Sequence, residues 1–310
     1  MRAEHLRPKQ CTGGGELAGE VNHHEYTELI PIRRYRPVEP HGVPGMTGVS
    51  EGIRLAGDLL KQSSWTAVLT GAGVSTESGL PDFRSTPAPG RPGGLWTGLD
   101  PMRVASASAF ARDPDAFYRF YRHRLSHLAG AKPNAAHRAI VQLETLGLVQ
   151  LVITQNVDRL HQEAGSREVV EVHGNLWEAR CQSCGSIVPI AEMARQLDAG
   201  AHPRCASCGG RLRPNVVLFE EMLPVDAYER AEDACLRCEA LLVVGSSLEV
   251  YPVAGLPSLA KERGAKIVIV NSEPTDRDQL ADILLRGQAG EILPAIVRAA
   301  QQATARARPS

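Results

Sequence analysis

Two pairs of cysteines at metal-binding spacing give the strongest chemical signal in the sequence. Cys181 and Cys184 form one C-x-x-C pair, and after twenty intervening residues Cys205 and Cys208 form another. This spacing is typical of a tetrahedral four-cysteine zinc site, and the glycines beside each pair let main-chain N–H groups turn towards the sulfurs. Four thiolates leave no open position for water. The sequence therefore predicts one structural zinc ion per chain.

The other cysteines carry a weaker signal. Cys235 and Cys238 form a third C-x-x-C pair in a predicted helix, where positions i and i+3 share one face. No second pair at zinc spacing accompanies them, so we expect them to pack in the core, with a redox role as the alternative. Cys11 stands alone, and seven cysteines are too few for a disulfide scaffold in a chain of 310 residues.

Polar residues follow two predicted strands at the points where those strands end. Thr154-Gln-Asn-Val-Asp158 comes after one strand, and His173-Gly-Asn175 comes after the next. The carboxyl ends of parallel strands are where open α/β sheets bind ligands, and clustered polar side chains are costly there unless they serve one. A lone histidine with satisfied hydrogen bonds would be the simpler explanation for His173. Beside Asn156 and Asp158, a functional role is favoured.

A glycine-rich loop, Gly71-Ala-Gly-Val-Ser-Thr76, follows the predicted strand 66–70. Glycines let main-chain N–H groups approach a phosphate closely. The loop fails the G-x-G-x-x-G dinucleotide fingerprint, because Thr76 occupies the third glycine position and we expect no helical run directly after it. A ligand-free turn would explain the glycines. It would not explain Asp82, Phe83 and Arg84, which follow closely.

The elements that must position these residues alternate along the chain. Apolar β-branched strands alternating with amphipathic helices predict an α/β fold with a doubly wound parallel sheet. The rhythm stops between residues 175 and 213, where two cysteine pairs lie, so we expect a small inserted zinc-binding module there. We predict strands at 66–70, 149–154, 168–172, 240–244 and 266–270, and helices at 113–128, 135–146, 224–238 and 290–302.

The composition of the chain argues against several classes of protein. Thirty-four basic and 35 acidic side chains leave a net charge of −1, which argues against a basic surface that coats a duplex; we expect no direct sequence-specific nucleic-acid binding. No apolar run reaches the roughly 18 residues of a membrane span, and no signal peptide is visible. We expect a soluble cytoplasmic protein. Residues 1–45 are rich in Gly, Pro, His and Arg, which predicts a disordered extension, or an over-called start with Met46 as initiator.

In its motifs the chain resembles the sirtuins, a family of NAD-dependent protein deacylases, from about residue 49 to 298. Two departures from the family pattern are visible: Arg159 stands where a glycine or small polar residue is common, and Glu220 replaces the glycine of the usual Phe-Gly-Glu. Besides the four cysteines, the matching motifs are Gly71-Ala-Gly-Val-Ser75, Gly79-Leu-Pro-Asp-Phe-Arg84, Pro133-Asn-Ala-Ala-His137, Thr154-Gln-Asn-Val-Asp158, Leu160-His161, His173-Gly-Asn175, Pro214-Asn-Val-Val-Leu-Phe219, Gly245-Ser-Ser247 and Val270-Asn-Ser-Glu-Pro-Thr275.

The resemblance implies a fold and a cofactor site. A Rossmann-like catalytic domain would span 46–300, carry a helical insertion at about 85–132 and a zinc module at about 175–213, and end in a tail, 301–310. NAD would lie extended in the cleft between the large and the small domain. The contacts implied for NAD are Gly71, Ala72, Gly73, Ser75, Thr76, Asp82, Phe83, Arg84, Gln155, Asn156, Asp158, Gly245, Ser246, Ser247, Asn271, Glu273 and, less surely, Ala289.

The resemblance also implies a reaction on acylated-lysine proteins. The acyl oxygen attacks the ribose C1′ and nicotinamide leaves. His173 then acts as general base on a ribose hydroxyl, which attacks the imidate carbon, and water finally releases free lysine and O-acyl-ADP-ribose. Asn156 is the second expected catalytic residue, and Val216, Val217 and Leu218 would pair with the substrate main chain. Two alternatives stay open: a mono-ADP-ribosyltransferase that uses the same pocket, and a non-catalytic sensor of NAD or acyl-lysine.

One pair of residues bears on the acyl group. Tyr121 and Arg124 lie at i and i+3 of the predicted helix 113–128 and share one face. In sirtuins that remove succinyl or malonyl groups, a Tyr-x-x-Arg pair in this helix grips the distal carboxylate, which a guanidinium can bind bidentately. The same helix carries other tyrosines and arginines, so the spacing can also arise by chance. We expect plain deacetylation as the default, with desuccinylation or demalonylation as the alternative.

Overall fold

The computed structural model describes residues 48–82 and 93–306, with side chains to residue 302. The expected extension at 1–45 and the expected NAD contacts Phe83 and Arg84 lie outside the described residues.

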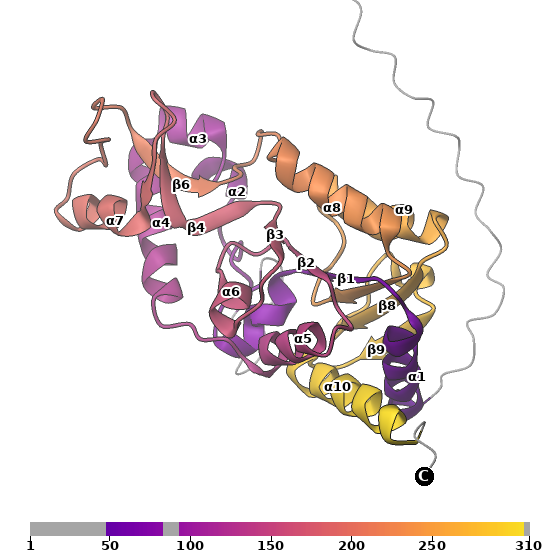
Figure 1. The fold of residues 1–310 in the computed structure, drawn as a ribbon. Helices are drawn as coiled ribbons and strands as arrows, with labels where there is room; N and C mark the ends of the chain where they lie inside the picture. The colour runs from indigo at the N-terminus through magenta and orange to yellow at the C-terminus, as the bar shows by residue number, and fades with distance from the viewer. Residues whose placement is uncertain (1–47, 83–92, 307–310) are drawn as a thin grey trace, which may run out of the picture. The chain divides into compact units, whose positions relative to one another are not determined.

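A six-stranded parallel sheet forms the centre of the larger domain (Figure 1). The strand order β3-β2-β1-β7-β8-β9 places β1 between β2 on one side and β7 on the other, so the chain winds in both directions from β1. This confirms the predicted doubly wound sheet. The strands are β1 (Thr66–Thr70), β2 (Leu151–Thr154), β3 (Val169–Glu171), β7 (Ala240–Val244), β8 (Lys266–Asn271) and β9 (Ile283–Arg286).

Successive residues of each strand pack in two separate cores, because side chains alternate between the two faces of a sheet. On β1, Val68 packs in the core that contains α1 (Val49–Gln62), α5 (Ala135–Thr145) and α10 (Ala289–Arg306). Its neighbours Ala67 and Leu69 pack in the other core, beneath α8 (Val225–Arg237) and α9 (Leu256–Glu262). Figure 1 shows the two helix layers on opposite faces of the sheet. Cys235 and Cys238 lie buried in the second core, as expected for packing residues.

The small domain combines two separate stretches of the chain. Its helices are α2 (Pro101–Val104), α3 (Ala107–Arg112), α4 (Pro114–Leu128) and α7 (Ile190–Asp198). They pack with a three-stranded antiparallel sheet, β4 (Gly174–Cys181), β5 (Ile187–Pro189) and β6 (Leu212–Val216), in the order β5-β4-β6. A third core lies between them and includes Phe110, Phe117, Met193 and Leu212. The small domain therefore has its own apolar core to hold its two parts together.

The structure corrects several predicted elements. The glycine-rich loop is itself helical, which was not expected: the 3-10 helix η1 spans Ala72–Ser78 and ends at Gly79 in the left-handed conformation, so that, as expected, no extended helical run follows Thr76 directly in the described residues. Residues 301–306, expected in the tail, continue α10. Strand β9 and helix α7 were not predicted. The remaining short elements are α6 (Leu160–Ala164), η2 (Val253–Gly255) and η3 (Asp278–Leu280).

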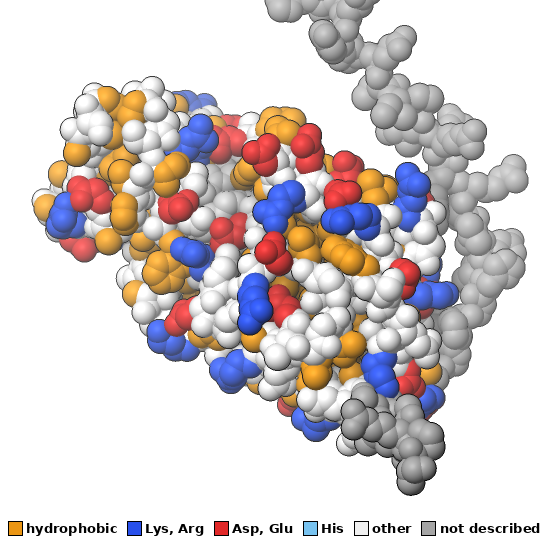
Figure 2. Space-filling view, in the orientation of Figure 1, with side chains coloured by type: hydrophobic (Ala, Val, Ile, Leu, Met, Phe, Trp, Pro, Cys, Tyr) orange, Lys and Arg blue, Asp and Glu red, His pale blue; other side chains and the backbone are white. Residues whose placement is uncertain are grey.

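Charge is mixed over the surface. Figure 2 shows Lys and Arg interspersed with Asp and Glu on one face, with no continuous area of either sign. Among the residues that the structure describes, no helix is both long enough and apolar enough to cross a bilayer.

Two buried histidines meet where α5 and α6 pack together, one on each helix. The rings of His137 and His161 are 4.8 Å apart, and His161 Nε2 lies 3.0 Å from Thr70 Oγ1. Burial disfavours the charged imidazole, which lowers the pKa of His137 to about 4 and that of His161 to about 3. Both rings are therefore neutral in the folded protein at neutral pH.

These histidines should make the fold sensitive to acid. In the unfolded chain a histidine has a pKa of about 6.5, so below that pH the unfolded state binds protons that the folded state cannot. We expect His161 to contribute stability that is complete above pH 6.5 and falls by up to about 2 kcal/mol on going to pH 5. Urea unfolding of wild type and His161→Gln at pH 7.5 and 5 tests this, since glutamine does not titrate. Equal losses in the two proteins would contradict it.

Candidate active site

Two adjoining cavities open at the carboxyl ends of the parallel strands. The larger has a volume of about 560 Å³ and the smaller about 100 Å³, and both are lined by Ala72, Arg124, Val157 and Leu176. The loops that follow β1, β2, β7 and β8 supply wall residues of the larger cavity. The expected site residues on this wall are Gly71, Ala72, Gly73, Asp82, Gln155, His173, Val216, Val217, Leu218, Gly245, Ser246, Ser247, Asn271, Glu273, Tyr121 and Arg124.

The glycines of the first loop are required by the approach of a second loop. A Cβ on Gly71 would lie 2.8 Å from Gly245 O, and a Cβ on Gly73 would lie 2.8 Å from Gly245 Cα. Gly73 N donates to Gly245 O over 2.8 Å, which fixes the two loops against each other. From the sequence we expected these glycines to allow the close approach of a phosphate. The close contact with the loop after β7 is by itself sufficient to require glycine at both positions.

Asn156 is held by a chain of buried hydrogen bonds. Its Nδ2 donates to Gly71 O over 3.1 Å and to Ser75 Oγ over 3.0 Å, and Ser75 Oγ donates to Asp158 Oδ2 over 2.7 Å. These bonds fix which way the amide faces. Its Oδ1 is buried and has no hydrogen-bond partner among the described residues, and Asn156 lines the smaller cavity. An unpaired buried acceptor at a cavity wall suits a ligand that brings an N–H group, such as a carboxamide.

His173 is oriented as a base. Its Nδ1 donates to Gln155 O over 3.0 Å, which leaves Nε2 as the nitrogen with a lone pair. The side chain is half-buried and lines the larger cavity. Burial lowers the pKa of His173 below its usual value of 6.5. The imidazole is therefore unprotonated at neutral pH and can accept a proton there.

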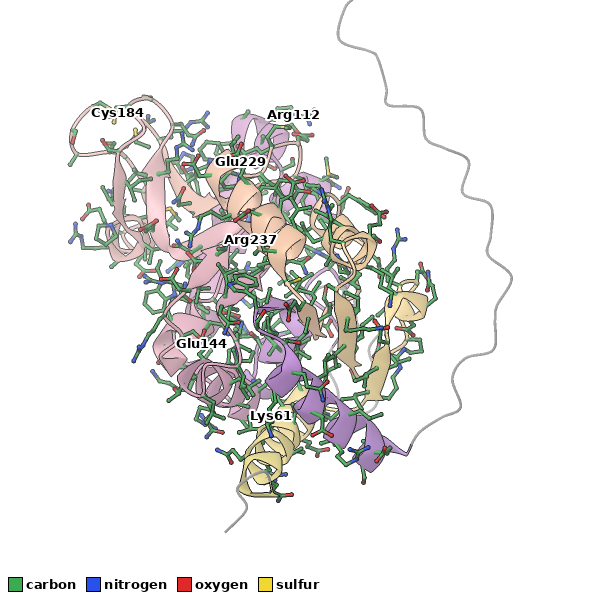
Figure 3. The ribbon with its side chains drawn as sticks, turned by 45° about the vertical axis from the view of Figure 1, so that its right-hand side comes forward. Lys61, Arg112, Glu144, Cys184, Glu229 and Arg237 are labelled. Atoms are coloured by element: carbon green, nitrogen blue, oxygen red, sulfur yellow. The ribbon has the colours of Figure 1, made fainter. Side chains whose placement is uncertain are left out.

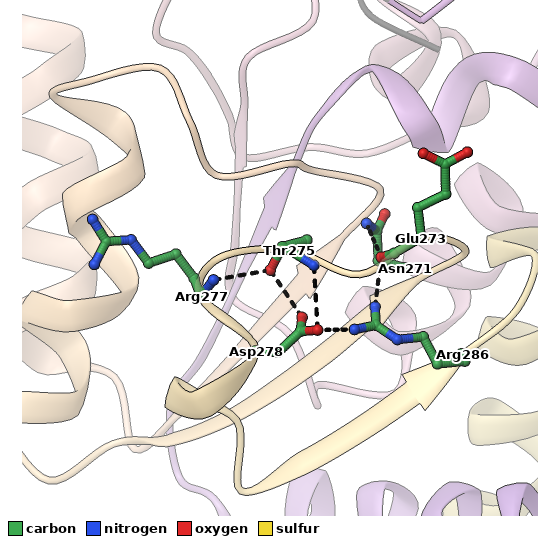
Figure 4. A network of polar contacts seen from close by, with 6 residues as sticks. All are labelled: Asn271, Glu273, Thr275, Arg277, Asp278 and Arg286. Carbon is green, nitrogen blue, oxygen red and sulfur yellow. Dashed lines mark hydrogen bonds and ion pairs between the residues drawn. The ribbon is translucent and has the colours of Figure 1, made fainter. Parts of the chain in front are cut away.

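One part of the wall of the larger cavity is a loop that is held by its own polar contacts (Figure 4). Asn271 Nδ2 donates to Glu273 O over 2.9 Å, and Arg286 Nη1 donates to the same oxygen over 2.6 Å. Arg286 also pairs with Asp278, whose carboxylate accepts from the N–H and hydroxyl of Thr275. Figure 4 shows the Glu273 carboxylate turned away from this network. Asn271 and Glu273 thus stand on a fixed loop at the cavity wall.

The expected substrate strand is hydrogen-bonded directly to His173, the expected general base. Val217 N donates to His173 O over 2.9 Å, and Leu218 N donates to Glu221 Oε2 over 2.9 Å. Phe219 N donates to Ala105 O over 3.1 Å. These three N–H groups are already used within the protein, so a substrate main chain would have to pair with other groups of this segment.

Tyr121 and Arg124 lie together on the wall of the larger cavity, on one face of α4. Tyr121 packs against Phe117 and Phe120, with ring centroids 4.6 and 5.1 Å away. Burial raises the pKa of Tyr121 to about 12 and lowers the pKa of Arg124. The packing fixes the position of the Tyr121 ring, and its phenol and the Arg124 guanidinium are close enough to interact electrostatically.

Not every expected residue reaches the site. Within the described part of the chain, Thr76 and Ala289 line neither cavity: Thr76 Oγ1 donates to Gly73 O, and Ala289 is buried at the start of α10. Other residues of the cavity wall were not expected from the sequence. Glu249, Val250 and Tyr251 directly continue the Gly245-Ser-Ser loop and could have been found from it, whereas nothing in the local sequence marks Trp96 and Ala105.

The four predicted metal ligands come together at the end of the small domain, where Figure 3 shows Cys184 in the loop between β4 and β5. All four sulfurs lie within 4.8 Å of one another; Cys181 Sγ is 3.5 Å from Cys208 Sγ, and Cys184 Sγ is 3.8 Å from Cys205 Sγ. Sulfurs bound tetrahedrally at 2.3 Å from one ion lie about 3.8 Å apart. Ser183 N and Gly210 N each point at a sulfur, 3.4 Å away. The cluster fits a zinc ion.

Comparison with known proteins agrees with this geometry. The sequence model of the Sir2 family matches residues 71–252. The NAD-dependent protein deacylase 2 of Pyrobaculum aerophilum is 47% identical over 240 residues, which are 77% of this chain and 92% of that protein. A solved Sir2 homologue in complex with NAD has a TM-score of 0.73 at 40% identity, over 80% of this chain and 93% of its own. A Sir2 protein bound to a myristoylated histone peptide has a TM-score of 0.69 at 40% identity, over 83% of this chain and 99% of its own. The chain belongs to the Sir2 family, the sirtuins.

Proposed function

We propose that this protein is an NAD-dependent protein-lysine deacylase. One observation carries the proposal: the unpaired Oδ1 of Asn156 and the lone-pair nitrogen of His173 belong to two cavities that share part of their walls. An acceptor for a carboxamide and a base for a hydroxyl are the two groups that the reaction asks of the protein. The Pyrobaculum relative, named a deacylase, and the NAD complex of a Sir2 homologue support it.

Each group of residues at the site would have a different role in the proposed reaction. NAD, when bound, supplies the ribose carbon that is attacked and nicotinamide as the leaving group. Asn156 would accept a hydrogen bond from the carboxamide and so orient that end of the molecule. His173 would take a proton from a hydroxyl at Nε2, while its Nδ1–H stays bonded to Gln155 O. Apolar wall residues such as Val157 and Leu176 would keep water from the reacting atoms.

Zinc would be structural in this scheme. The donor set of four thiolates leaves no open position for water or substrate, and the site lies at the end of the small domain (Figure 3). We infer that the ion holds together the loops that connect β4, β5 and β6. The free thiols that such a site needs also favour the cytoplasm as the location.

Nicotinamide release tests the proposed function. Purified protein and NAD are incubated with an acetyl-lysine peptide, with the same peptide unacetylated, and with no peptide. A deacylase releases nicotinamide in step with free lysine and only with the acylated peptide. Release that does not need the acyl group, with label from NAD on a protein, would favour the mono-ADP-ribosyltransferase. No release in any arm would favour the sensor.

A preference for acidic acyl groups is a second candidate, favoured by the position of Tyr121 and Arg124 on the same cavity wall as His173. A carboxylate at the end of a succinyl group could accept two bonds from the guanidinium and one from the phenol. The partly buried setting would strengthen these bonds, because fewer water molecules compete with them.

We expect Arg124→Met to lower kcat/KM for a succinyl-lysine peptide by about 100-fold and to change kcat/KM for the acetyl peptide by less than about threefold, since only the first substrate has a carboxylate to bind. Methionine keeps much of the apolar bulk of the side chain. The KM for NAD, measured with the acetyl peptide, is the control. A wild-type enzyme that removes acetyl far faster than succinyl from the same peptide would leave the pair without this role.

A further inference from the structure

Glu220 stands where the family pattern has a glycine, and the structure shows what that exchange entails. The residue has φ 75°, in the left-handed region that glycine adopts freely and glutamate resists. A strained non-glycine residue persists only where its surroundings hold it in place. The contacts of the Glu220 carboxylate therefore show what holds this residue in its strained conformation.

The carboxylate binds the start of a helix from the other part of the small domain. Ser108 N donates to Glu220 Oε2 over 2.8 Å, and Ser108 Oγ donates to Glu220 Oε1 over 3.0 Å. Ser108 lies in the first turn of α3, where main-chain N–H groups have no acceptor within the helix. Arg112, an exposed residue of the same helix that is labelled in Figure 3, donates to Ser108 Oγ over 2.8 Å.

Main-chain bonds join the same two parts of the protein next to Glu220. Ala107 N donates to Phe219 O, and Phe219 N donates to Ala105 O, both over 3.1 Å. We call residues 216–221 the substrate-lining segment, since all six line the larger cavity. At one end this segment bonds to His173 through Val217, and at the other end Glu220 fastens it to α3.

We propose that Glu220 is a positioning residue, which fixes the substrate-lining segment against α3 so that the segment can receive an acyl-lysine peptide without first being ordered. The proposal rests on the deacylase function proposed above. It assigns to the carboxylate the role of a clamp rather than a direct contact with substrate. A segment ordered in advance binds a peptide at a smaller entropic cost.

Glu220→Gly removes the carboxylate bonds to Ser108 without adding backbone strain. Glycine accepts the φ of 75° but has no carboxylate, so the strain is relieved while the bonds to Ser108 are lost. We expect the KM for an acetyl-lysine peptide to rise about tenfold, while kcat and the KM for NAD stay within about twofold. Glu220→Gln keeps an oxygen acceptor and should rescue most of the effect. An unchanged peptide KM in Glu220→Gly would overturn the proposal.

A second experiment measures hydrogen exchange in the protein without substrate. Hydrogen exchange of residues 216–221 should be about tenfold faster in Glu220→Gly than in wild type. The exchange rate in Ser108→Ala should lie between these two. Adding Ser108→Ala to Glu220→Gly should not raise the rate further. Ser126→Ala is the control, since this exposed hydroxyl donates to His123 O within α4, away from the substrate-lining segment. If wild type shows no acyl-dependent turnover, the deacylase function fails, and exchange alone decides on the clamp. Unchanged exchange in Glu220→Gly would overturn it.

Discussion

We expect His173→Ala to lower deacylation by about 10²–10⁴-fold while NAD still binds, because the imidazole supplies proton transfer rather than affinity. The backbone bond from Val217 to His173 O does not need the side chain, so the substrate-lining segment should stay in place. Turnover with an acyl-lysine peptide and NAD binding by calorimetry are the two measurements. His202→Ala is the matched control, because His202 is an exposed histidine that pairs with Asp115. Retention of more than about half of wild-type turnover would remove His173 from the mechanism.

The pH profile gives the same prediction a second readout. Burial lowers the pKa of His173 below 6.5, so the base is already unprotonated at neutral pH. We therefore expect kcat to stay level above pH 6.5 and to fall only as the pH drops below that value. His173→Ala should lack this acidic limb. An identical limb in the variant would assign the titration to another group.

We expect Cys181→Ala to lose the zinc ion and to unfold the small domain, whereas His173→Ala should leave the fold intact. Binding of a structural zinc ion supplies folding free energy on the order of 10 kcal/mol, and three thiolates hold the ion poorly. Cys181 is buried against the core of that domain, so its loss also disturbs packing. Bound metal per chain and limited proteolysis of residues 175–213 measure the effect.

Two further variants separate metal binding from packing. Cys208→Ala removes an exposed ligand and should lose zinc to the same extent. Cys235→Ala removes a buried thiol outside the cluster and should keep one zinc per chain. A small domain that stays protease-resistant after a chelator has stripped the metal would contradict the structural role.

The sheet was largely predictable because buried parallel strands are continuous apolar runs. The predicted strand 240–244 is β7 as found, and the predicted helix 113–128 differs from α4 only in Asp113, which is its N-cap and accepts from Ala116 N. Elements that depend on a distant partner were missed. Strand β9 has four residues at the sheet edge, and α7 shows an apolar face, Met193 and Leu197, that makes sense only against the small domain's core.

Many of the residues that line the two cavities were predictable, but their arrangement was not. Strand ends and polar residues pointed to Asn156 and His173, but the direction of the Asn156 amide depends on Gly71, which the loop at Gly245 holds in place from far along the chain. Likewise the sequence marks Glu220 as unusual, yet its partner Ser108 lies 112 residues earlier. Spacing along a chain carries no information on such contacts.

The most direct test of the deacylase function is the fate of the acyl group. An acetyl-lysine peptide, labelled in the acetyl group, is converted with NAD, and the products are identified by mass spectrometry. The proposed reaction predicts one nicotinamide per lysine freed, with the label on ADP-ribose. Label released as free acetate from the start, with NAD intact, would contradict the account, as would ADP-ribose attached to the peptide or to the protein.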